Sequence, residues 1–220
     1  MLIDLDFAAV LSEWPLILRG LAWTLALTVV GTVLGLLTGI ACAWARTGGP
    51  AWLRAIVATY VEAIRNTPFI VQLFFLFFGL PAAGIRISPE VASVLAMVIN
   101  LGAYSAEIVR AGIEATPKGL IEAGVSLALS RAQLFVHVVL PPALKKVWPA
   151  IVSQAVIVML GSSVCSQVSM PELSYAANLI QSRTFRAFEA FLVATALYLG
   201  LAVALRGVLG WIGPRFLFGR

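Results

Sequence analysis

The sequence predicts an all-α membrane protein with five transmembrane helices. Of its 220 residues, 61% are hydrophobic and 11% are charged, whereas water-soluble domains average about 45–50% and about 25%. Five long stretches of 16 to 26 residues also contain no charged side chain. A chain of 23.4 kDa that crosses the bilayer this often leaves no room for a soluble catalytic domain.

Helices are the only state that suits these stretches. About 20 helical residues span the roughly 30 Å of bilayer hydrocarbon, and neither open sheets nor a five-stranded barrel would satisfy the backbone there. The whole chain, residues 1–220, is therefore predicted to form a single transmembrane domain. Its predicted spans are residues 17–45, 55–80, 89–112, 147–168 and 188–209.

The distribution of lysine and arginine predicts the orientation. With the N-terminus outside, eleven of the 15 Lys and Arg residues fall on the cytoplasmic side, as the positive-inside rule requires. The C-terminus is then cytoplasmic, and the largest cytoplasmic segment is the loop at residues 113–146. These basic residues are scattered singly and form no basic stripe, so we expect membrane lipid and no nucleic acid as a partner.

The first two spans contain small and polar residues at helical spacing. Gly31, Gly35 and Gly39 recur every four residues, a pattern that allows close helix contact. Packing within the subunit is favoured over a contact between subunits. In the second span, Glu62 and Arg65 are predicted to pair at i, i+3. Pro68 is then predicted to kink the helix, and Gln72 lies one turn deeper.

The third span has a polar stripe on one face, because its polar residues are spaced by four, three, four and three positions. A charge in the bilayer costs at least about 2.5–3.5 kcal/mol, so the stripe should face protein or a cavity. We expect Glu107 to pair with Arg110 near the inner interface. The stripe consists of Asn100, Tyr104, Glu107, Ala111 and Glu114.

The loop after this span is predicted to contain two short helices, at about 117–128 and 131–139. Thr116 with Pro117 indicates the start of the first helix, and Ser130 with Gln133 forms a capping box for the second. Two consecutive prolines, Pro141 and Pro142, are predicted to end the second helix. Small residues on the first helix would let another backbone approach closely, which indicates a cytoplasmic docking surface. These small residues are Ala123, Gly124 and Ala128.

The fourth span has polar positions at Gln154, Ser162 and Ser163. Beyond it, Ser169 and Glu172 are predicted to form a capping box for an external helix.

The sequence offers no catalytic or metal-binding constellation. Cys42 and Cys165 lie in apolar segments and are expected to be small buried residues. His137 is the only histidine, so neither a proton relay nor a metal site can be built from it. The expected sets of catalytic and metal-ligating residues are therefore empty.

One stretch of the loop resembles the signature of the permease subunits of ABC-type importers, especially those for polar amino acids such as histidine and glutamine. The signature runs Glu-Ala-Ala, three residues, Gly, nine residues, Ile, one residue, Leu-Pro. The matching stretch here is IEAGVSLALSRAQLFVHVVLPPAL. Alanine replaces the signature glycine at position 128, which indicates that this position needs no positive φ.

Three further stretches resemble the same family, and together they cover most of residues 55–200. They lie around the second span, from the third span into the loop, and before the fifth span. Their sequences are TYVEAIRNTPFIVQLFFLFFGLP, NLGAYSAEIVRAGIEATPKGLIEAG and ELSYAANLIQSRTFRAFEAF.

The resemblance implies a type I ABC importer permease in a bacterial inner membrane. Its partners would be two copies of an ATPase subunit, a second permease as a homo- or heterodimer, an external substrate-binding protein and a polar amino acid. ATP and magnesium would bind to the partner ATPase, since G-x-x-x-x-G-K-[ST] is absent here and no cofactor is expected on this chain. The implied residues for coupling to the ATPase are Glu122, Ala123, Gly124, Ala128, Leu140 and Pro141.

Polar residues inside the spans are the candidates for lining the substrate path. Related permeases often have charged residues near Ser162, and their absence here suggests the hypothesis that a second, different permease completes the site. Two other classes stay open as alternatives: a self-sufficient ion-coupled secondary transporter or channel, and an intramembrane enzyme. The path candidates are Asn100, Tyr104, Gln72, Gln154, Ser162 and Ser163.

Overall fold

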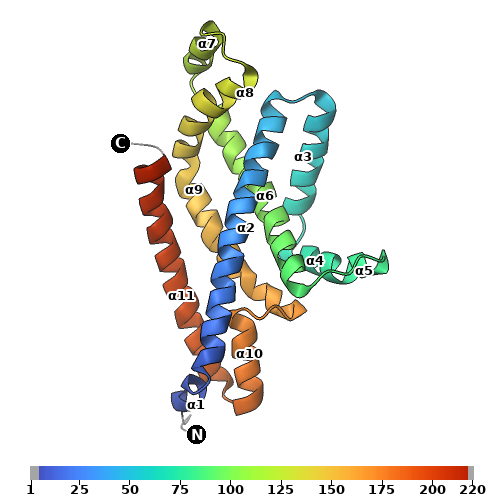
Figure 1. The fold of residues 1–220 in the computed structure, drawn as a ribbon, viewed down its shortest axis with the longest axis vertical. Helices are drawn as coiled ribbons and strands as arrows, with labels where there is room; N and C mark the ends of the chain where they lie inside the picture. The colour runs from blue at the N-terminus through green and yellow to red at the C-terminus, as the bar shows by residue number, and fades with distance from the viewer. Residues whose placement is uncertain (1–4, 218–220) are drawn as a thin grey trace. The chain divides into compact units, whose positions relative to one another are not determined.

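The computed structural model describes residues 5–217, which are helical apart from short turns and contain no β-strand (Figure 1). Arg220, one of the predicted cytoplasmic basic residues, lies outside the described part. The α-helices are α1 (Phe7–Leu11), α2 (Trp14–Gly48), α3 (Ala51–Arg65), α4 (Phe69–Phe74), α5 (Leu80–Ala82), α6 (Pro89–Glu114), α7 (Lys118–Ser126), α8 (Arg131–Gln133), α9 (Leu140–Gly161), α10 (Leu173–Thr184) and α11 (Ala187–Ile212). Wider π-helical turns form η1 (Phe75–Gly79), η2 (Leu134–Val139) and η4 (Gly213–Leu217), and η3 (Ser162–Val168) is a 3₁₀-helix.

The predicted all-α membrane fold is confirmed, and its second span is broken. Four helices within residues 5–217 are long and apolar enough to cross a bilayer, and α3 together with Phe69–Ala82 makes a fifth span if the pair is counted as one. The four continuous spans are Trp14–Gly48, Pro89–Glu114, Arg131–Val168 and Ala187–Arg215.

The break in the second span replaces the kink that the sequence predicted. Helix α3 ends at Arg65, and Pro68 precedes α4 with φ −59° and ψ 140°. Proline disfavours the helical conformation of the residue before it, so the helix stops. Side chains then take up the last carbonyls of α3: Asn66 Nδ2 donates to Glu62 O at 2.8 Å, and Thr67 Oγ1 to Ala63 O at 2.7 Å.

The prediction that Pro141 and Pro142 end the second loop helix is wrong. Helical structure continues from Arg131 to Val168, and both prolines lie in the first turn of α9. The physical reason is the preceding π-helical turn, η2. Local π-helical adjustments are one way in which a membrane-spanning helix accommodates proline and continues.

The chain forms two compact units, each built from several segments. The first unit comprises Met1–Thr32, Pro68–Met97 and Val156–Ala204, and the second comprises Val33–Thr67, Val98–Ala155 and Leu205–Arg220. A core of the first unit joins α1, α2, α10 and α11 through residues that include Val10, Ile17, Leu173 and Ala190.

The core of the second unit has two parts. In one part Ala43, Val109 and Ile151 bring α2, α6 and α9 together. In the other part, residues of α3 pack against α6 and α2 around Val61 and Ala106. Within this unit, α3 therefore lies beside α2 and α6 (Figure 1).

The glycine stripe of α2 packs within the subunit, as the sequence favoured. In the first unit, Gly31 faces the Met97 side chain. In the second unit, Gly35 faces Leu101, and a Cβ on Gly39 would overlap Ser105 and the backbone of Ala106. Close contact between α2 and α6 thus depends on glycine.

A bulky side chain at Gly39 should destabilise the protein because the facing atoms are backbone and short side chains. We expect Gly39→Leu to lower the free energy of unfolding by about 1–3 kcal/mol, measured by thermal unfolding in detergent. Gly207→Leu is the matched control, since a Cβ there meets no atom within 4 Å. An equal melting temperature for the Gly39→Leu and Gly207→Leu proteins would refute the α2–α6 contact.

Candidate functional site

The loop after α6 consists of helix α7 followed by α8 and η2. The predicted capping box is confirmed: Ser130 Oγ accepts from Gln133 N at 3.3 Å, and Gln133 Oε1 accepts from Ser130 N at 2.9 Å. The predicted role of Thr116 as N-cap is wrong. Pro117 is the cap residue of α7, and Thr116, two residues beyond the end of α6, instead donates through Oγ1 to Gly112 O at 3.3 Å.

Gly124 lies where helix α7 packs against η2. It is the buried residue of α7, and a Cβ there would overlap Leu134 of η2. Within the described chain, the close approach at this glycine is therefore to the loop itself, and its contact with a partner backbone stays a prediction. Glu122 and Ala123 beside it are exposed.

Ala128 has φ +52°, so the expectation that this position needs no positive φ is wrong. It follows α7 in a Schellman motif: Ala128 N donates to Val125 O at 2.9 Å, and Leu129 N donates to Gly124 O at 3.3 Å. The left-handed conformation costs a residue with a Cβ roughly 1–2 kcal/mol. The signature glycine that alanine replaces would remove that cost.

The tip of the loop exposes apolar side chains. Val125 is 61% exposed and Leu127 is 74% exposed. The remaining coupling candidates lie at the other end of the loop, where Leu140 packs against the second unit's core and Pro141 is exposed. His137, also exposed, has Nδ1 3.1 Å from Gln133 O.

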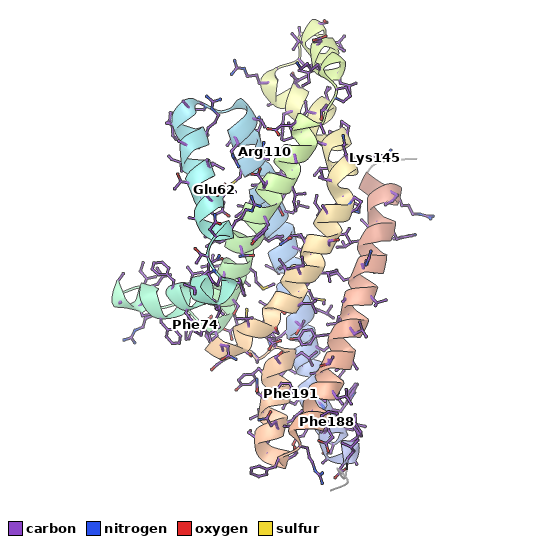
Figure 2. The ribbon with its side chains drawn as sticks, turned by 180° about the vertical axis from the view of Figure 1, so that it is seen from behind. Glu62, Phe74, Arg110, Lys145, Phe188 and Phe191 are labelled. Atoms are coloured by element: carbon purple, nitrogen blue, oxygen red, sulfur yellow. The ribbon has the colours of Figure 1, made fainter. Side chains whose placement is uncertain are left out.

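Charges on α2 and α6 neutralise one another in the second unit. The predicted Glu107–Arg110 pair is confirmed. Arg110 also forms an ion pair with Glu114. Arg46 of α2 is a fourth member that was not predicted, and it donates to Glu107 at 2.6 Å. An arginine and a glutamate at the ends of two different spans could have suggested this link. Figure 2 labels Arg110 on α6.

The end of α3 carries charged side chains that do not pair as predicted. Glu62 accepts from Asn66 Nδ2 at 3.1 Å, and no Glu62–Arg65 ion pair occurs among residues 5–217. Arg65 instead lies over the Tyr104 ring, with its guanidinium carbon 5.6 Å from the ring centre. Tyr104 Oη is 3.5 Å from Arg65 O.

The path candidates divide between the two units. In the second unit, Asn100 and Tyr104 of α6 and Gln154 of α9 are half-buried. In the first unit, α4 contacts η3, which brings the helix of Gln72, itself 7% exposed, against the helix of Ser162 and Ser163. Residues so distant in the chain could not be placed side by side from the sequence alone.

Ser162 and Ser163 differ in what they face. Ser162 Oγ donates to Met159 O at 2.6 Å and is buried. Ser163 Oγ donates to Leu160 O at 2.7 Å and lines a cavity of about 350 Å³ whose other polar groups include Ser174, Thr195 and Tyr198.

Glu172 caps α10 by itself, and the predicted box with Ser169 is wrong. Its carboxylate accepts from Tyr175 N at 2.8 Å and from Tyr198 Oη. Ser169 instead ends η3 with φ +64°. Glu172 is fully buried, and this burial raises the pKa of its carboxyl group despite the hydrogen bonds that it accepts. Cys165, also in the first unit, is a free buried cysteine, and Cys42 in the second is half-buried.

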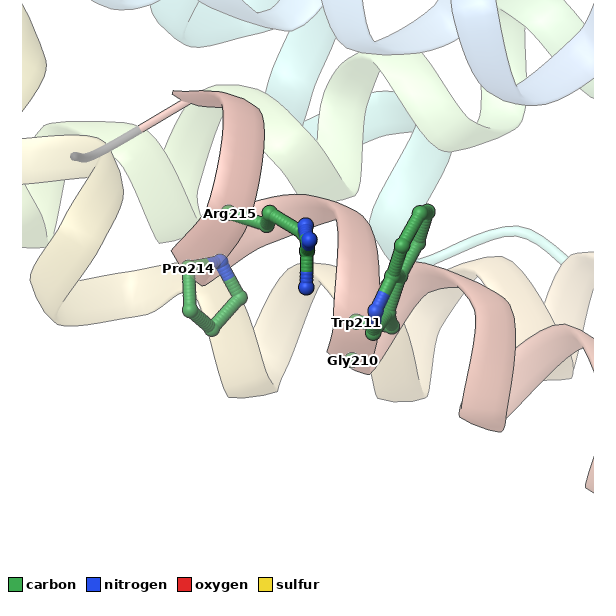
Figure 3. Close-up of a pocket in the computed structure, with 4 residues that line it drawn as sticks. All are labelled: Gly210, Trp211, Pro214 and Arg215. Atoms are coloured by element: carbon green, nitrogen blue, oxygen red, sulfur yellow. The ribbon is translucent and has the colours of Figure 1, made fainter. Parts of the chain in front are cut away.

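A hollow of about 550 Å³ lies at the end of the last span, and its described lining residues are Gly210, Trp211, Pro214 and Arg215 (Figure 3). The guanidinium carbon of Arg215 is 5.3 Å from the centre of the Trp211 ring. Tryptophan and arginine at a span end are typical of anchoring at the membrane interface. We therefore assign this hollow no solute.

Comparisons with known proteins agree along almost the whole chain. Residues 31–218 match the family described as "Binding-protein-dependent transport system inner membrane component". The chain is 36% identical over 207 residues to the glutamine transport system permease protein GlnP of Escherichia coli (strain K12), covering 93% of this chain and 94% of that protein. It is 34% identical over 172 residues to the L-cystine transport system permease protein TcyB of Bacillus subtilis (strain 168), covering 78% and 74%.

Solved structures show the same fold. A crystal structure of an amino acid ABC transporter with histidines matches with a TM-score of 0.86 and 32% identity, over 97% of this chain and 100% of that chain. An inward-facing MetNI methionine ABC transporter matches with a TM-score of 0.69 over 92% of this chain and 94% of that chain. At 23% identity, the second match concerns the fold alone.

Replacing Ala128 with glycine should stabilise the loop by about 1 kcal/mol, because glycine adopts a positive φ without steric cost. Native-state trypsin cleavage at Arg131 should slow about fivefold, since cleavage requires the loop to open. Ala123→Gly within α7 is the matched control and should destabilise by about 1 kcal/mol. Faster cleavage of the Ala128→Gly protein would contradict the assigned backbone conformation.

Proposed function

This chain belongs to the family of binding-protein-dependent transport system inner membrane components, and we propose that it forms the membrane path of an ABC importer for a polar amino acid. The observation that carries this proposal is likeness over nearly the full length: 36% identity across 93% of the chain to a glutamine permease. A TM-score of 0.86 to an amino acid ABC transporter supports the same function.

The energy for transport would come from partners. We propose two copies of an ATPase subunit that bind ATP and magnesium, an external binding protein that delivers the amino acid, and a second permease, identical or different. The chain itself has no G-x-x-x-x-G-K-[ST] motif to hold a nucleotide phosphate. The family description, which names both binding-protein dependence and the inner membrane, supports this arrangement.

The loop at residues 113–146 is the proposed contact with the ATPase. Its exposed apolar tip at Val125 and Leu127 suits burial against a partner, and the exposed Glu122 and Ala123 lie on the same helix. Gly124 and Ala128 act indirectly by fixing the shape of the loop. Since helical structure runs from Arg131 to Val168 without interruption, displacement of the loop would move α9 with it.

ATP-driven import can be tested by measuring the initial rate of uptake of tritiated L-glutamine, L-arginine and L-cystine in cells that express the complete importer. Uptake should stop when ATP is depleted and persist when ionophores collapse the ion gradients. Leu127→Asp should lower uptake and release the ATPase on purification, because it places a charge in an apolar contact.

Ile85→Asp is the matched control, since Ile85 is 54% exposed in the turn between α5 and α6, on the predicted outer side. Its uptake and ATPase association should equal those of the unchanged protein. Uptake that survives ATP depletion and collapses with the gradient would favour the secondary transporter instead. Full coupling in the Leu127→Asp protein would refute the role of the loop tip.

A further inference from the structure

Arg65 places a charge at the break in the second predicted span. Helix α3 has 15 residues and is therefore about 22 Å long at about 1.5 Å per residue, which is shorter than the roughly 30 Å of hydrocarbon. Arg54 lies near its start, and Arg65 is its last residue. If α3 begins at the interface, Arg65 lies about 16 Å beyond Arg54 along the axis, well inside the bilayer. An arginine at that depth raises the free energy of the membrane-inserted protein unless its side chain faces protein or water.

No carboxylate of the described chain neutralises this charge. Ion pairs within residues 5–217 engage Arg46, Arg110, Arg183 and Arg186, whereas Arg65 is exposed and forms none. Its neighbour on the helix, Glu62, accepts from Asn66 instead. The charge of Arg65 is therefore left available to an anion from outside the chain.

Tyr104 holds the guanidinium in place without neutralising its positive charge. The ring lies below the guanidinium carbon at 5.6 Å, an arrangement stabilised by the cation–π attraction. A guanidinium also presents its N–H groups in a fixed planar fork that matches both oxygens of a carboxylate. The contact with Tyr104 thus orients the Arg65 guanidinium, whose N–H groups can bind a carboxylate.

Glu62 supplies the opposite charge one helical turn away. Residues at i and i+3 have Cβ atoms about 5–6 Å apart on one side of a helix, and both side chains are exposed. Figure 2 labels Glu62 on α3. The carboxylate keeps acceptor capacity beyond its bond to Asn66 Nδ2. A free amino acid has its carboxylate and ammonium on one carbon, so it can engage both side chains at once.

We propose that Arg65, held by Tyr104, binds the α-carboxylate of the transported amino acid and that Glu62 binds its α-ammonium group. This inference rests on the proposed function and deepens it: the site selects the zwitterionic backbone common to amino acids and leaves the side chain to other contacts. It also accounts for the missing counter-ion of Arg65, because the cargo itself provides one.

The test is equilibrium binding to the permease–ATPase complex in nanodiscs, without the external binding protein. Tritiated L-glutamine, L-arginine and L-cystine are the probes, and the α-carboxamide of each is the competitor. We expect Arg65→Gln to weaken binding at least tenfold, Arg65→Lys to weaken it less, and Glu62→Gln to weaken it as well. Arg54→Gln, on the same helix, should bind like the unchanged complex.

The preference for the free acid over its α-carboxamide is the decisive readout, because a purely structural role of Arg65 would not alter it. The unchanged complex should prefer the acid at least tenfold, and Arg65→Gln should lose this preference. Retained affinity and preference in Arg65→Gln overturn the inference and leave the proposed function intact. The inference is also overturned, and the proposed function again stays intact, if the complex binds none of the probes yet imports them with ATP. If it neither binds nor imports them, the proposed function fails as well.

Discussion

The cost of placing a charge in hydrocarbon governs how this chain is arranged. At the end of α6, Glu107 and Arg110 neutralise each other and join Glu114 and Arg46, so that one charge network ties α2 to α6. Arg65 forms no such ion pair among residues 5–217, although Glu62 lies one turn away, and its guanidinium lies over the Tyr104 ring instead. A membrane protein retains such a charge where water or a ligand reaches it. The polar end of α3 is therefore the part of the second unit best suited to meet a solute.

Features that depend on local spacing could be predicted from the sequence. Apolar stretches located the spans, Ser130 and Gln133 identified a capping box, and glycines at four-residue intervals identified a tight helix contact. Features that depend on the backbone conformation or on contacts with other helices could not be predicted. A π-turn that precedes Pro141 leaves no sequence signal, alanine at position 128 conceals a left-handed residue, and Arg65 turns to Tyr104 because α6 lies beside α3.

Within the loop, the residues that maintain its fold differ from the residues proposed to contact the ATPase. Gly124 is buried against Leu134 and Ala128 closes the turn after α7, so both maintain the shape of the loop. Leu127 and Val125 are exposed apolar residues and are available to a partner. One set of residues in this short loop thus maintains its shape, and another set is proposed to contact the partner. In the proposed coupling, the continuous helix from the loop into α9 would provide the mechanical link to the membrane.

The accessibility of the α3 end tests the central claim most directly, because a solute path requires water at bilayer depth. In a protein with Cys42 and Cys165 replaced, Ala63→Cys places a thiol on the exposed side of α3, and Leu199→Cys places one at a 65% exposed apolar position of α11. In the reconstituted complex, a charged methanethiosulfonate reagent should modify the thiol at position 63 and spare the one at position 199. Equal protection of both thiols would mean that the α3 end faces lipid or protein, and the account would be wrong.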